Sequence, residues 1–340
     1  MNSPRNAPVT VLVTGAGGPA GVAVIRSLLR RGGIRVLAAD MDAYASGLYL
    51  VPATDRRLIP PGLDPDFGDR MLTLCARERV DVLFPTVDVE LPVIAGRSAE
   101  FVERGTAVAS PSLPTLTVCL DKLHLARRCA GVLPVPRTEP LSPAAVVDRL
   151  FPVIVKPRRG AGSRGIRLVE SARELLAMGT DDTRLVQDYL PGEEFSVDVL
   201  AGLDGAVISA VPRSRLRVDS GVSVAGRTVR DAELEAAARA VAIAIGLTTV
   251  ANVQLKRDRD GRAALLEVNP RFPGAMPLTV AAGVDMPSLT LDLMLGRPVP
   301  GRIDFRELAV VRYLDDVFLD PSEVLDRVPA NGSLHHAVRA

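Results

Sequence analysis

Lysine is scarce in this sequence, where three lysines stand against 38 arginines among 340 residues. Lys156 ends the apolar run Phe151–Val155 and precedes a glycine-rich loop, and Lys122 follows Asp121. A lysine ammonium binds phosphate as a compact point charge, whereas arginine offers a planar fork. We therefore expect Lys122 and Lys156 to bind phosphates, and we interpret Lys256 as an ordinary lysine without a special role.

Histidine and cysteine are equally rare, with three of each. The histidines, of which His335 and His336 lie near the C-terminus, are too few to favour a histidine-based metal site or catalytic triad. The cysteines are odd in number and lack the spacing of metal or redox motifs. Reduced thiols, as in a cytosolic protein, are the expectation.

Tryptophan is absent and aromatic residues make up 4% of the sequence, which leaves few candidates for base-stacking surfaces. The net charge of +1 gives no basic footprint for nucleic acid. The longest uncharged stretch, residues 240–255, is interrupted by polar residues, and the N-terminus lacks the apolar core of a signal peptide. These absences predict a cytoplasmic protein that binds neither nucleic acid nor membrane.

The first third of the chain has a strand–helix–strand pattern. A buried strand is predicted at Val9–Val13, a helix at Val22–Arg31 that ends before two glycines, and a strand at Ile34–Ala39 that ends at Asp40. Further along, the pattern predicts a helix at Asp69–Arg79 and strands at Val82–Phe84 and Val108–Ala109. This order predicts a doubly wound parallel sheet in a first domain of residues 1–112.

The rest of the chain reads as antiparallel strands with a few helices. Helices are predicted at Thr115–Ala130, Asp231–Gly246 and Ser288–Leu295. Strands are predicted at Val153–Lys156, Gly165–Val169, Arg184–Tyr189, Glu194–Leu200, Ala206–Val211, Val250–Arg257 and Ala263–Val268.

The glycine loop after the first strand, with Asp40 after the second, is a weak dinucleotide signal. Glycines allow phosphate to approach a helix N-terminus, and an acidic residue can bind a ribose. The spacing differs from G-x-G-x-x-G, because Gly21 follows Gly17 by four positions. A tight turn with no ligand is an equal alternative; if a ligand binds, Gly17 suits a small anionic substrate better than NAD.

A second glycine-rich loop follows Lys156. Gly160, Gly162 and Gly165 could form a flap of backbone N–H donors over phosphates. No Gly-Lys-Ser/Thr sequence follows, so the loop is not a Walker A motif. The alternative is an ordinary glycine-rich hairpin.

A candidate metal site ends the predicted hairpin. Glu267 and Asn269 are two residues apart on one strand and face the same side, and Gln254 lies on the preceding strand. Carboxylate and amide oxygens suit Mg²⁺ that also binds phosphate. Arg271, just beyond, could hold a transferring phosphoryl group. A charged residue and a turn asparagine at a strand end are the alternative for each residue alone.

Taken together and in this order, these residues resemble the ATP-grasp superfamily, nearest to its carbamoyl-phosphate-synthase large-subunit-like and carboxylate–amine ligase branches. The resemblance implies an α/β fold, α+β in the catalytic part. A Rossmann-like pre-ATP-grasp domain (1–112) would precede a two-lobed ATP-grasp domain (113–300) and a C-terminal extension (301–340). The lid lobe would cover about 113–188 and the C-terminal lobe about 189–300.

The resemblance also implies a role for each site residue. Nucleotide-binding residues would be Lys122, Lys156, Gly160, Gly162, Ser163 and Gly165 with the phosphates, Gln187, Asp188, Tyr189 and Leu190 with adenine, Glu194 with ribose, and Gln254. Gln254, Glu267 and Asn269 would bind Mg²⁺ or Mn²⁺, Arg271 would hold the acyl phosphate, and Lys156 would assist catalysis. Many family members have a carboxylate where this chain has Gln254, so the number of bound metal ions, one or two, is left open.

The implied activity is an ATP-dependent carboxylate–amine ligase that forms an acyl phosphate and releases ADP and phosphate. Its partners would be small-molecule carboxylates and amines, and a homodimer is left open. The alternatives are a carbamoyl-phosphate-synthase-like enzyme that uses bicarbonate or carbamate, an NAD(P)-binding oxidoreductase, and a non-catalytic nucleotide-binding module.

Two sets of residues are candidates for substrate binding. Asp88 and Glu90 follow a strand at the carboxyl edge of the first sheet, where they could hold an amino group or simply be solvated. Arg213, Arg215 and Arg217 alternate and are expected to share a strand face, where they could bind a carboxylate or form a solvated edge.

Overall fold

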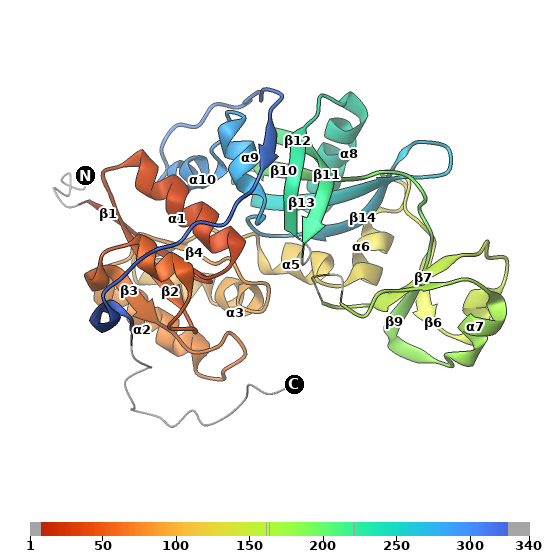
Figure 1. The fold of residues 1–340 in the computed structure, drawn as a ribbon, viewed down its shortest axis with the longest axis horizontal. Coiled ribbons are helices and arrows are strands. Elements are labelled where there is room, and N and C mark those ends of the chain that lie inside the picture. Colours follow the sequence, from red (N-terminus) through yellow and green to blue (C-terminus); the bar gives the residue numbers. More distant parts are fainter. Residues whose placement is uncertain (1–7, 161, 163, 220–221, 326–340) are drawn as a thin grey trace.

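The computed structural model describes residues 8–160, 162, 164–219 and 222–325, which form three sheets with helices around them. Figure 1 shows the first sheet at one end, the largest sheet in the middle and a small sheet at the other end. The predicted Ser163 lies outside the described residues. Within those residues, no helix is long and apolar enough to cross a membrane.

The first sheet is parallel throughout, with strand order β3-β2-β1-β4-β5. Its strands are β1 (Val9–Val13), β2 (Ile34–Asp40), β3 (Arg56–Leu58), β4 (Val82–Phe84) and β5 (Ala107–Val108). Val11 and Val13 pack with α1 (Pro19–Arg31), whereas Leu12 packs with α2 (Phe67–Glu78) in a separate core. Since alternate residues of β1 are buried on opposite faces, helices cover both faces, and the doubly wound prediction is confirmed.

Helix α1 begins at Pro19, three residues before the predicted start at Val22. Proline suits the first turn of a helix because its φ is already helical and its missing N–H has no partner there. The helix ends before Gly32, whose φ is 72°, as its sequence predicts. The remaining short elements around the first sheet are η1 (Ser46–Leu50), η2 (Ala53–Asp55), α3 (Leu91–Gly96) and α4 (Ser98–Glu103).

The single helix predicted over Thr115–Ala130 is wrong, because the chain forms α5 (Leu113–Cys119) and α6 (Lys122–Cys129). Asp121 separates them: its carboxylate accepts hydrogen bonds from the backbone N–H groups two and three residues later, both at 3.1 Å, and so caps α6. The break places Lys122 at the first position of a helix.

Helices α5 and α6 also lie outside the lobe predicted for them. Cys119, Leu125 and Cys129 are buried in the core of the largest sheet, together with α8 (Ala232–Ala244). The small sheet begins only at Thr138. The predicted lid lobe of about 113–188 is therefore shorter at its N-terminal end.

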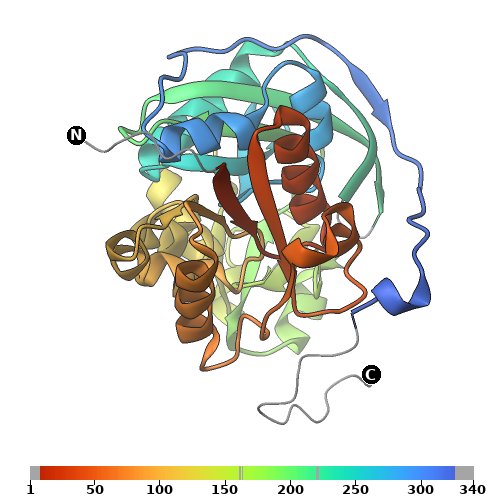
Figure 2. The same ribbon diagram turned by 90° about the vertical axis from the view of Figure 1, so that its left-hand side faces the viewer.

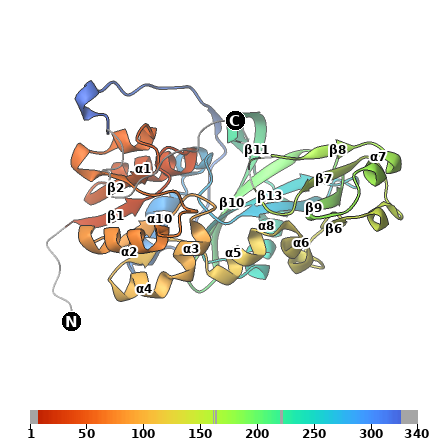
Figure 3. The same cartoon turned by 90° about the horizontal axis from the view of Figure 1, so that it is seen from below.

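The small sheet is antiparallel, with strand order β6-β9-β7-β8 and a core of its own. It comprises β6 (Thr138–Leu141), η3 (Pro143–Val146), β7 (Val153–Pro157), β8 (Arg167–Val169), α7 (Ala172–Ala177) and β9 (Asp181–Asp188). In Figure 3 it projects from the rest of the molecule at the end opposite the first sheet.

The largest sheet has six antiparallel strands in the order β14-β13-β10-β11-β12-β15. Its strands are β10 (Glu194–Ala201), β11 (Val207–Asp219), β12 (Val222–Thr228), β13 (Thr249–Arg257), β14 (Ala263–Asn269) and β15 (Ala309–Val311). The last of these strands lies beyond residue 300, so part of the predicted C-terminal extension completes this sheet. Figure 2 shows the chain after β15 running along the outside of the molecule to η4 (Pro321–Glu323).

The first domain and the largest sheet share one hydrophobic core. Leu28 of α1 is fully buried there with Val250 of β13 and Leu291 of α10 (Met286–Met294). Helix α9 (Met276–Ala281) contributes Met276 to the same core. These shared contacts fix the carboxyl edge of the first sheet against the end of β14.

Candidate functional site

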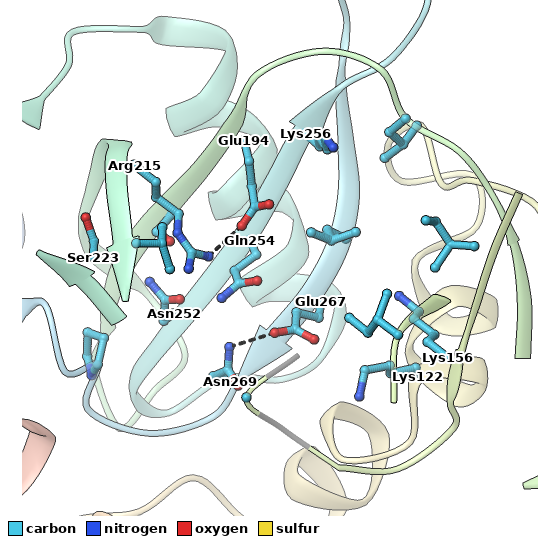
Figure 4. A pocket seen from close by; sticks show the side chains of 18 of the residues that line it. Lys122, Lys156, Glu194, Arg215, Ser223, Asn252, Gln254, Lys256, Glu267 and Asn269 are labelled. Carbon is cyan, nitrogen blue, oxygen red and sulfur yellow. Dashed lines mark hydrogen bonds and ion pairs between the residues drawn. The ribbon is translucent and has the colours of Figure 1, made fainter. Parts of the chain in front are cut away.

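A cavity of about 540 Å³ lies between the small and the largest sheet. Figure 4 shows side chains from both sheets pointing into it. The described residues predicted to bind nucleotide or metal line it, apart from Gly165: Lys122, Lys156, Gly160, Gly162, Gln187, Asp188, Tyr189, Leu190, Glu194, Gln254, Glu267, Asn269 and Arg271. Residues as far apart in the sequence as Lys122 and Arg271 thus line the same cavity.

The candidate metal ligands face one another across the β13–β14 hairpin. Gln254 is the direct cross-strand partner of Glu267, and Asn252 is that of Asn269. The Asn269 amide donates a hydrogen bond to Glu267 Oε1 at 3.3 Å, as Figure 4 shows. Sequence reasoning missed Asn252, although it follows the same two-residue spacing.

These donors fit Mg²⁺ that is held partly by phosphate. Among the described residues, no group of three or more His, Cys, Asp or Glu side chains could hold a metal alone. Mg²⁺ usually takes one or two carboxylates and completes its octahedron with water and substrate phosphates. One carboxylate with neighbouring amide oxygens matches that incomplete set.

Lys156 is buried at the small-sheet side of the cavity, with 3% of its surface exposed. Its Nζ donates a hydrogen bond to Gln187 Oε1 at 2.8 Å. The pKa of Lys156 is lowered to about 8, mainly by burial and to a smaller extent by the charge of Lys122, against the opposing effects of Glu267 and Glu194. An anion in the cavity would stabilise the charged lysine.

Lys122 closes the same side of the cavity from the start of α6. Its Nζ donates a hydrogen bond to the Gly160 carbonyl at 2.7 Å, and its backbone N–H to the Arg158 carbonyl at 3.1 Å. The Arg158 guanidinium contacts Asp121 at 2.8 Å. Although burial opposes it, this arginine and the helix N–H donors lower the pKa of Asp121. The corner ties α6 to the glycine loop, in which Gly162 has a φ of 73°.

The segment that joins the two sheets is held by a buried arginine. The Arg149 side chain, fully buried, donates hydrogen bonds to Asp188 Oδ1 at 2.7 Å and to Glu139 Oε2 at 2.8 Å. Sequence analysis gave no signal for Arg149, because neither acidic partner is near it in the chain. The ion pair between Arg149 and Asp188 orients the end of β9, where the predicted adenine-binding residues begin.

Lys256 does not fit its interpretation as an ordinary lysine. It lines the cavity, and its ammonium lies 5.3 Å from the centre of the Tyr189 ring. Lys256 is the cross-strand partner of Glu194, just as Gln254 is that of Ser196. The two-residue period that placed Gln254 in the site would also have placed Lys256 there.

The three alternating arginines of β11 do not share one face. Arg213 is buried and pairs with Asp198, and Arg215 pairs with Glu194 at 2.5 Å. Leu216 is an extra residue in a β-bulge, so Arg217 is exposed and does not line the cavity. The prediction that all three arginines share one strand face is therefore wrong for Arg217, whereas Arg213 and Arg215 both line the cavity.

A buried polar cluster supports the floor of the cavity. Asp198, with none of its surface exposed, accepts hydrogen bonds from Arg213 at 2.7 and 2.9 Å and from Asn252 at 2.7 Å. Thr279 of α9 donates a further hydrogen bond at 2.5 Å. The cluster links three strands and a helix behind the candidate metal ligands.

We expect Asp198→Ala to lower the free energy of unfolding by about 3–5 kcal/mol, because it leaves the buried Arg213 without its counter-charge. Denaturant titration would measure the loss. Asp304→Ala removes the partner of Arg230 in an exposed ion pair and should leave stability nearly unchanged. Equal effects of the two substitutions would contradict this account.

Arg271 connects the cavity to the first domain. Its guanidinium makes a bidentate ion pair with Asp88, with Nε–Oδ1 and Nη2–Oδ2 distances of 2.6 and 3.1 Å. Asp88 lies beyond the end of β4, 183 residues away in sequence. The structure thus gives Asp88 an arginine partner, whereas sequence analysis had suggested an amino group.

The first glycine loop is explained by close packing. A Cβ on Gly21 would lie 2.1 Å from the Gly15 carbonyl oxygen, so the turn excludes larger residues. Asp40 accepts a hydrogen bond from the Gly17 N–H at 2.8 Å and therefore uses one of the loop's donors. This contact favours the tight-turn alternative over a dinucleotide site, and Gly17 itself does not line either cavity.

Glu90 is 5% exposed and accepts a hydrogen bond from the Thr14 hydroxyl. The pKa of Glu90 is raised to about 7, mainly by burial and to a smaller extent by the negative charge of Asp40, against the opposing hydrogen bond from Thr14. The folded state therefore binds this proton more tightly than the unfolded chain. Stability from this group is complete at acidic pH and declines as the pH rises through 7.

Replacement of Glu90 by glutamine should remove that decline. Above pH 8 we expect Glu90→Gln to raise the free energy of unfolding by up to about 3 kcal/mol, because the buried position no longer has to ionise. Denaturant titrations from pH 5 to pH 9 would measure this. If both proteins lose stability in parallel over this range, Glu90 is not the buried acid responsible.

Two family models match the chain. One is described as "ATP-grasp in the biosynthetic pathway with Ter operon" and covers residues 180–317, and the other is a PylC-like N-terminal domain and covers residues 11–109. The first contains β10 to β14 with the candidate metal ligands, and the second contains the first sheet.

Curated relatives and solved structures agree with these matches. The chain is 27% identical over 195 residues to the carbamoyl phosphate synthase large chain of Clostridium beijerinckii, covering 53% of this chain and 17% of that one. It is 27% identical over 267 residues to a D-alanine–D-alanine ligase of Ectopseudomonas mendocina, covering 67% and 82%. The chain thus spans a small part of the first relative and most of the second.

Two solved structures share its fold. The biotin carboxylase domain of the Hydrogenobacter thermophilus 2-oxoglutarate carboxylase, crystallised with MgADP and bicarbonate, has a TM-score of 0.71 at 17% identity, over 87% of this chain and 71% of that one. The Staphylococcus aureus N5-carboxyaminoimidazole synthetase, complexed with ADP, has a TM-score of 0.70 at 15% identity, over 88% and 80%.

Proposed function

Because the chain belongs to the ATP-grasp superfamily, we propose that it is an ADP-forming ligase that joins a carboxylate to an amine through an acyl phosphate. One observation carries the proposal. Two lysines and a carboxylate with amide neighbours meet in one cavity, and Arg271 lies at its boundary with the first domain. The lysines and Arg271 would bind the phosphates of a nucleoside triphosphate and the acid to be phosphorylated, and the carboxylate would bind the metal ion.

The reaction would proceed in two displacements. In the first, a carboxylate oxygen of the substrate attacks the γ-phosphorus of ATP, and the bond to ADP breaks. In the second, the nitrogen of a neutral amine attacks the acyl carbon, and the C–O bond breaks with its electron pair leaving on phosphate. The amine nitrogen loses a proton as the amide forms.

The chain's own residues would position these groups and balance their charge. Lys122 and Lys156 would bind phosphate oxygens, and the glycine loop contacted by Lys122 would cover them and exclude water. Arg271 would turn from Asp88 toward the developing acyl phosphate. Glu267, Gln254 and Asn269 would hold Mg²⁺, which when bound neutralises phosphate charge.

Adenosine would bind between the segment 187–190 and Glu194. Both line the cavity next to Lys156, and Asp188 is fixed by Arg149. Glu194 is paired with Arg215 at 2.5 Å, so the ribose hydroxyls would share this carboxylate with that arginine.

The site supports the alternative activities to different degrees. A bicarbonate-using enzyme would need the same phosphate site, and it differs only in the acid that is phosphorylated. The oxidoreductase alternative relied on Asp40 and the first glycine loop, and the Gly17–Asp40 hydrogen bond occupies that loop. A binding module without catalysis would not need Glu267 and the amides beside a phosphate.

Hydroxylamine trapping would test the ligase. The purified protein would be incubated with ATP, Mg²⁺, pooled carboxylic acids including bicarbonate, and hydroxylamine, which converts an acyl phosphate to a stable hydroxamate. We expect ADP together with one hydroxamate, identified by mass spectrometry. Release of AMP would reject the acyl-phosphate mechanism, and ATP binding without any turnover across the pool would favour the binding module.

A further inference from the structure

A second cavity, of about 530 Å³, opens at the carboxyl edge of the first sheet. It is formed by the turns after β1, β2 and β4 and by residues 60–63, and Arg271 and Gly274 form its wall toward the nucleotide cavity. Its volume suits a small organic molecule, and this edge of a parallel sheet is where ligands gather. None of the residues assigned above to phosphate, metal or adenine lines it except Arg271.

The charge of this cavity is one-sided. Three carboxylates line it, Asp40, Asp88 and Glu90, against one guanidinium, Arg271. Arg271 and Asp88 neutralise each other in their bidentate pair. Asp40 accepts backbone hydrogen bonds, one of them from Gly17, and has no ion-pair partner among the described residues. Two acids are therefore left to attract a cation.

Glu90 provides an independent sign of a missing partner. It is 95% buried, and while one carboxylate oxygen accepts from Thr14, the other receives no hydrogen bond from any described residue. Glu90 lines the cavity, where a ligand can donate a hydrogen bond to the free oxygen of this buried carboxylate. The neighbouring carboxylate of Asp40 makes a positively charged donor the most favourable one.

The rest of the lining is apolar and defines the body of the ligand. The side chains include Pro19, Ala20, Pro60, Pro61, Val87 and Val89. Met41 and Leu63, which are 62% and 80% exposed, also line this cavity. These surfaces suit a short hydrocarbon portion next to a single charged group.

We propose that this cavity binds a primary-ammonium substrate, with its ammonium group held by Glu90 and Asp40 and its apolar body against the prolines. This assignment rests on the proposed function for the role of the ligand. Because Arg271 and Gly274 line both cavities, the bound molecule lies next to the acyl phosphate. Two kinds of substrate carry such an ammonium group: the acceptor amine, and an amino acid whose own carboxylate is phosphorylated.

The test is a binding measurement that needs no turnover. Ligand-observed NMR at pH 8.5, with and without MgADP, would compare n-butylamine, 2-aminobutanoic acid and the uncharged 1-butanol on the full chain. We expect at least one ammonium compound to bind ten-fold or more tightly than the alcohol. Preference for butylamine indicates the acceptor, and preference for aminobutanoic acid indicates the activated acid.

Variants assign the binding to this cavity. Glu90→Gln and Asp40→Asn should each weaken ammonium binding at least ten-fold without changing alcohol binding. Asp42→Asn is the matched control, because it removes a nearby carboxylate that does not line the cavity. Equal binding of amine and alcohol, no ammonium binding by the wild type, or equal effects of all three variants would overturn the assignment. ADP release is measured in parallel with the same proteins. If ADP and a hydroxamate form but the ammonium compounds do not bind as expected, the cavity assignment fails while the ligase proposal stands.

Discussion

Lys156→Met should reduce ADP formation by about 10²–10³-fold while leaving the protein folded. The substitution keeps most of the side-chain volume and removes the ammonium group of a residue that is 3% exposed. Since burial disfavours that charge, the variant should be at least as stable as the wild type, although Gln187 loses a hydrogen-bond donor. Initial rates with saturating acid and amine, together with thermal unfolding, would separate the two effects.

The pH dependence provides a second readout for Lys156. With a pKa of about 8 in the free protein, the lysine loses its proton as the pH rises from 7 to 9. We expect kcat/KM for ATP to fall over this range, because the free enzyme's ionisation governs that ratio. Lys156→Arg keeps the charge through this range and should lose the pH dependence but not regain full activity. Wild-type rates in Lys156→Met would remove the lysine from the phosphate site.

Glu267→Gln should also lower the rate by about 10²–10³-fold, because it removes the single carboxylate of the Gln254–Glu267–Asn269 set. The concentration of Mg²⁺ needed for half-maximal rate should rise in the same variant. Glu267 also favours the charged form of Lys156, so its removal should move the pH profile to lower pH. Rate measurements across Mg²⁺ concentration and pH would show both changes.

Asp260→Asn is the matched control for Glu267→Gln. It removes a carboxylate from the turn of the same hairpin, where Asp260 is exposed and pairs with Arg262. Its Mg²⁺ requirement and pH profile should equal those of the wild type. If both variants lose activity equally, the effect comes from the hairpin as a whole and not from the metal site.

The sequence predicted the elements whose patterns are local. The strand–helix–strand start and the β13–β14 hairpin follow from apolar runs and turn residues, and the period of two correctly placed Gln254 and Glu267 opposite each other. The period of two failed at Arg217, because the bulge at Leu216 shifts the register of β11. This bulge depends on how β11 pairs with β12, which the sequence of β11 alone does not reveal. The break between α5 and α6 was missed because a capping aspartate resembles any polar residue of a helix face.

Contacts between distant segments were beyond sequence reasoning. Asp88 and Arg271 each carried a separate interpretation, and no periodicity relates residues 183 positions apart. Arg149 is paired with Asp188, 39 residues away, and Asp198 accepts hydrogen bonds from Asn252 and Thr279, 54 and 81 residues away, so these contacts depend on how separate elements pack. Chemical types and spacings, together with the resemblance to the ATP-grasp superfamily, therefore pointed to the residues that line the first cavity, whereas its support from behind and its link to the first domain required the structure.

The two ends of the segment that forms the small sheet lie next to each other. Its first strand pairs with its last, with Thr138 opposite Gln187, and the Asp188 N–H donates a hydrogen bond to the Arg137 carbonyl at 3.0 Å. With its own core and adjacent ends, residues 138–188 have the architecture of an inserted module. Such a module can open as one cooperative unit while the remainder stays folded, which would let nucleotide exchange without disturbing the metal ligands.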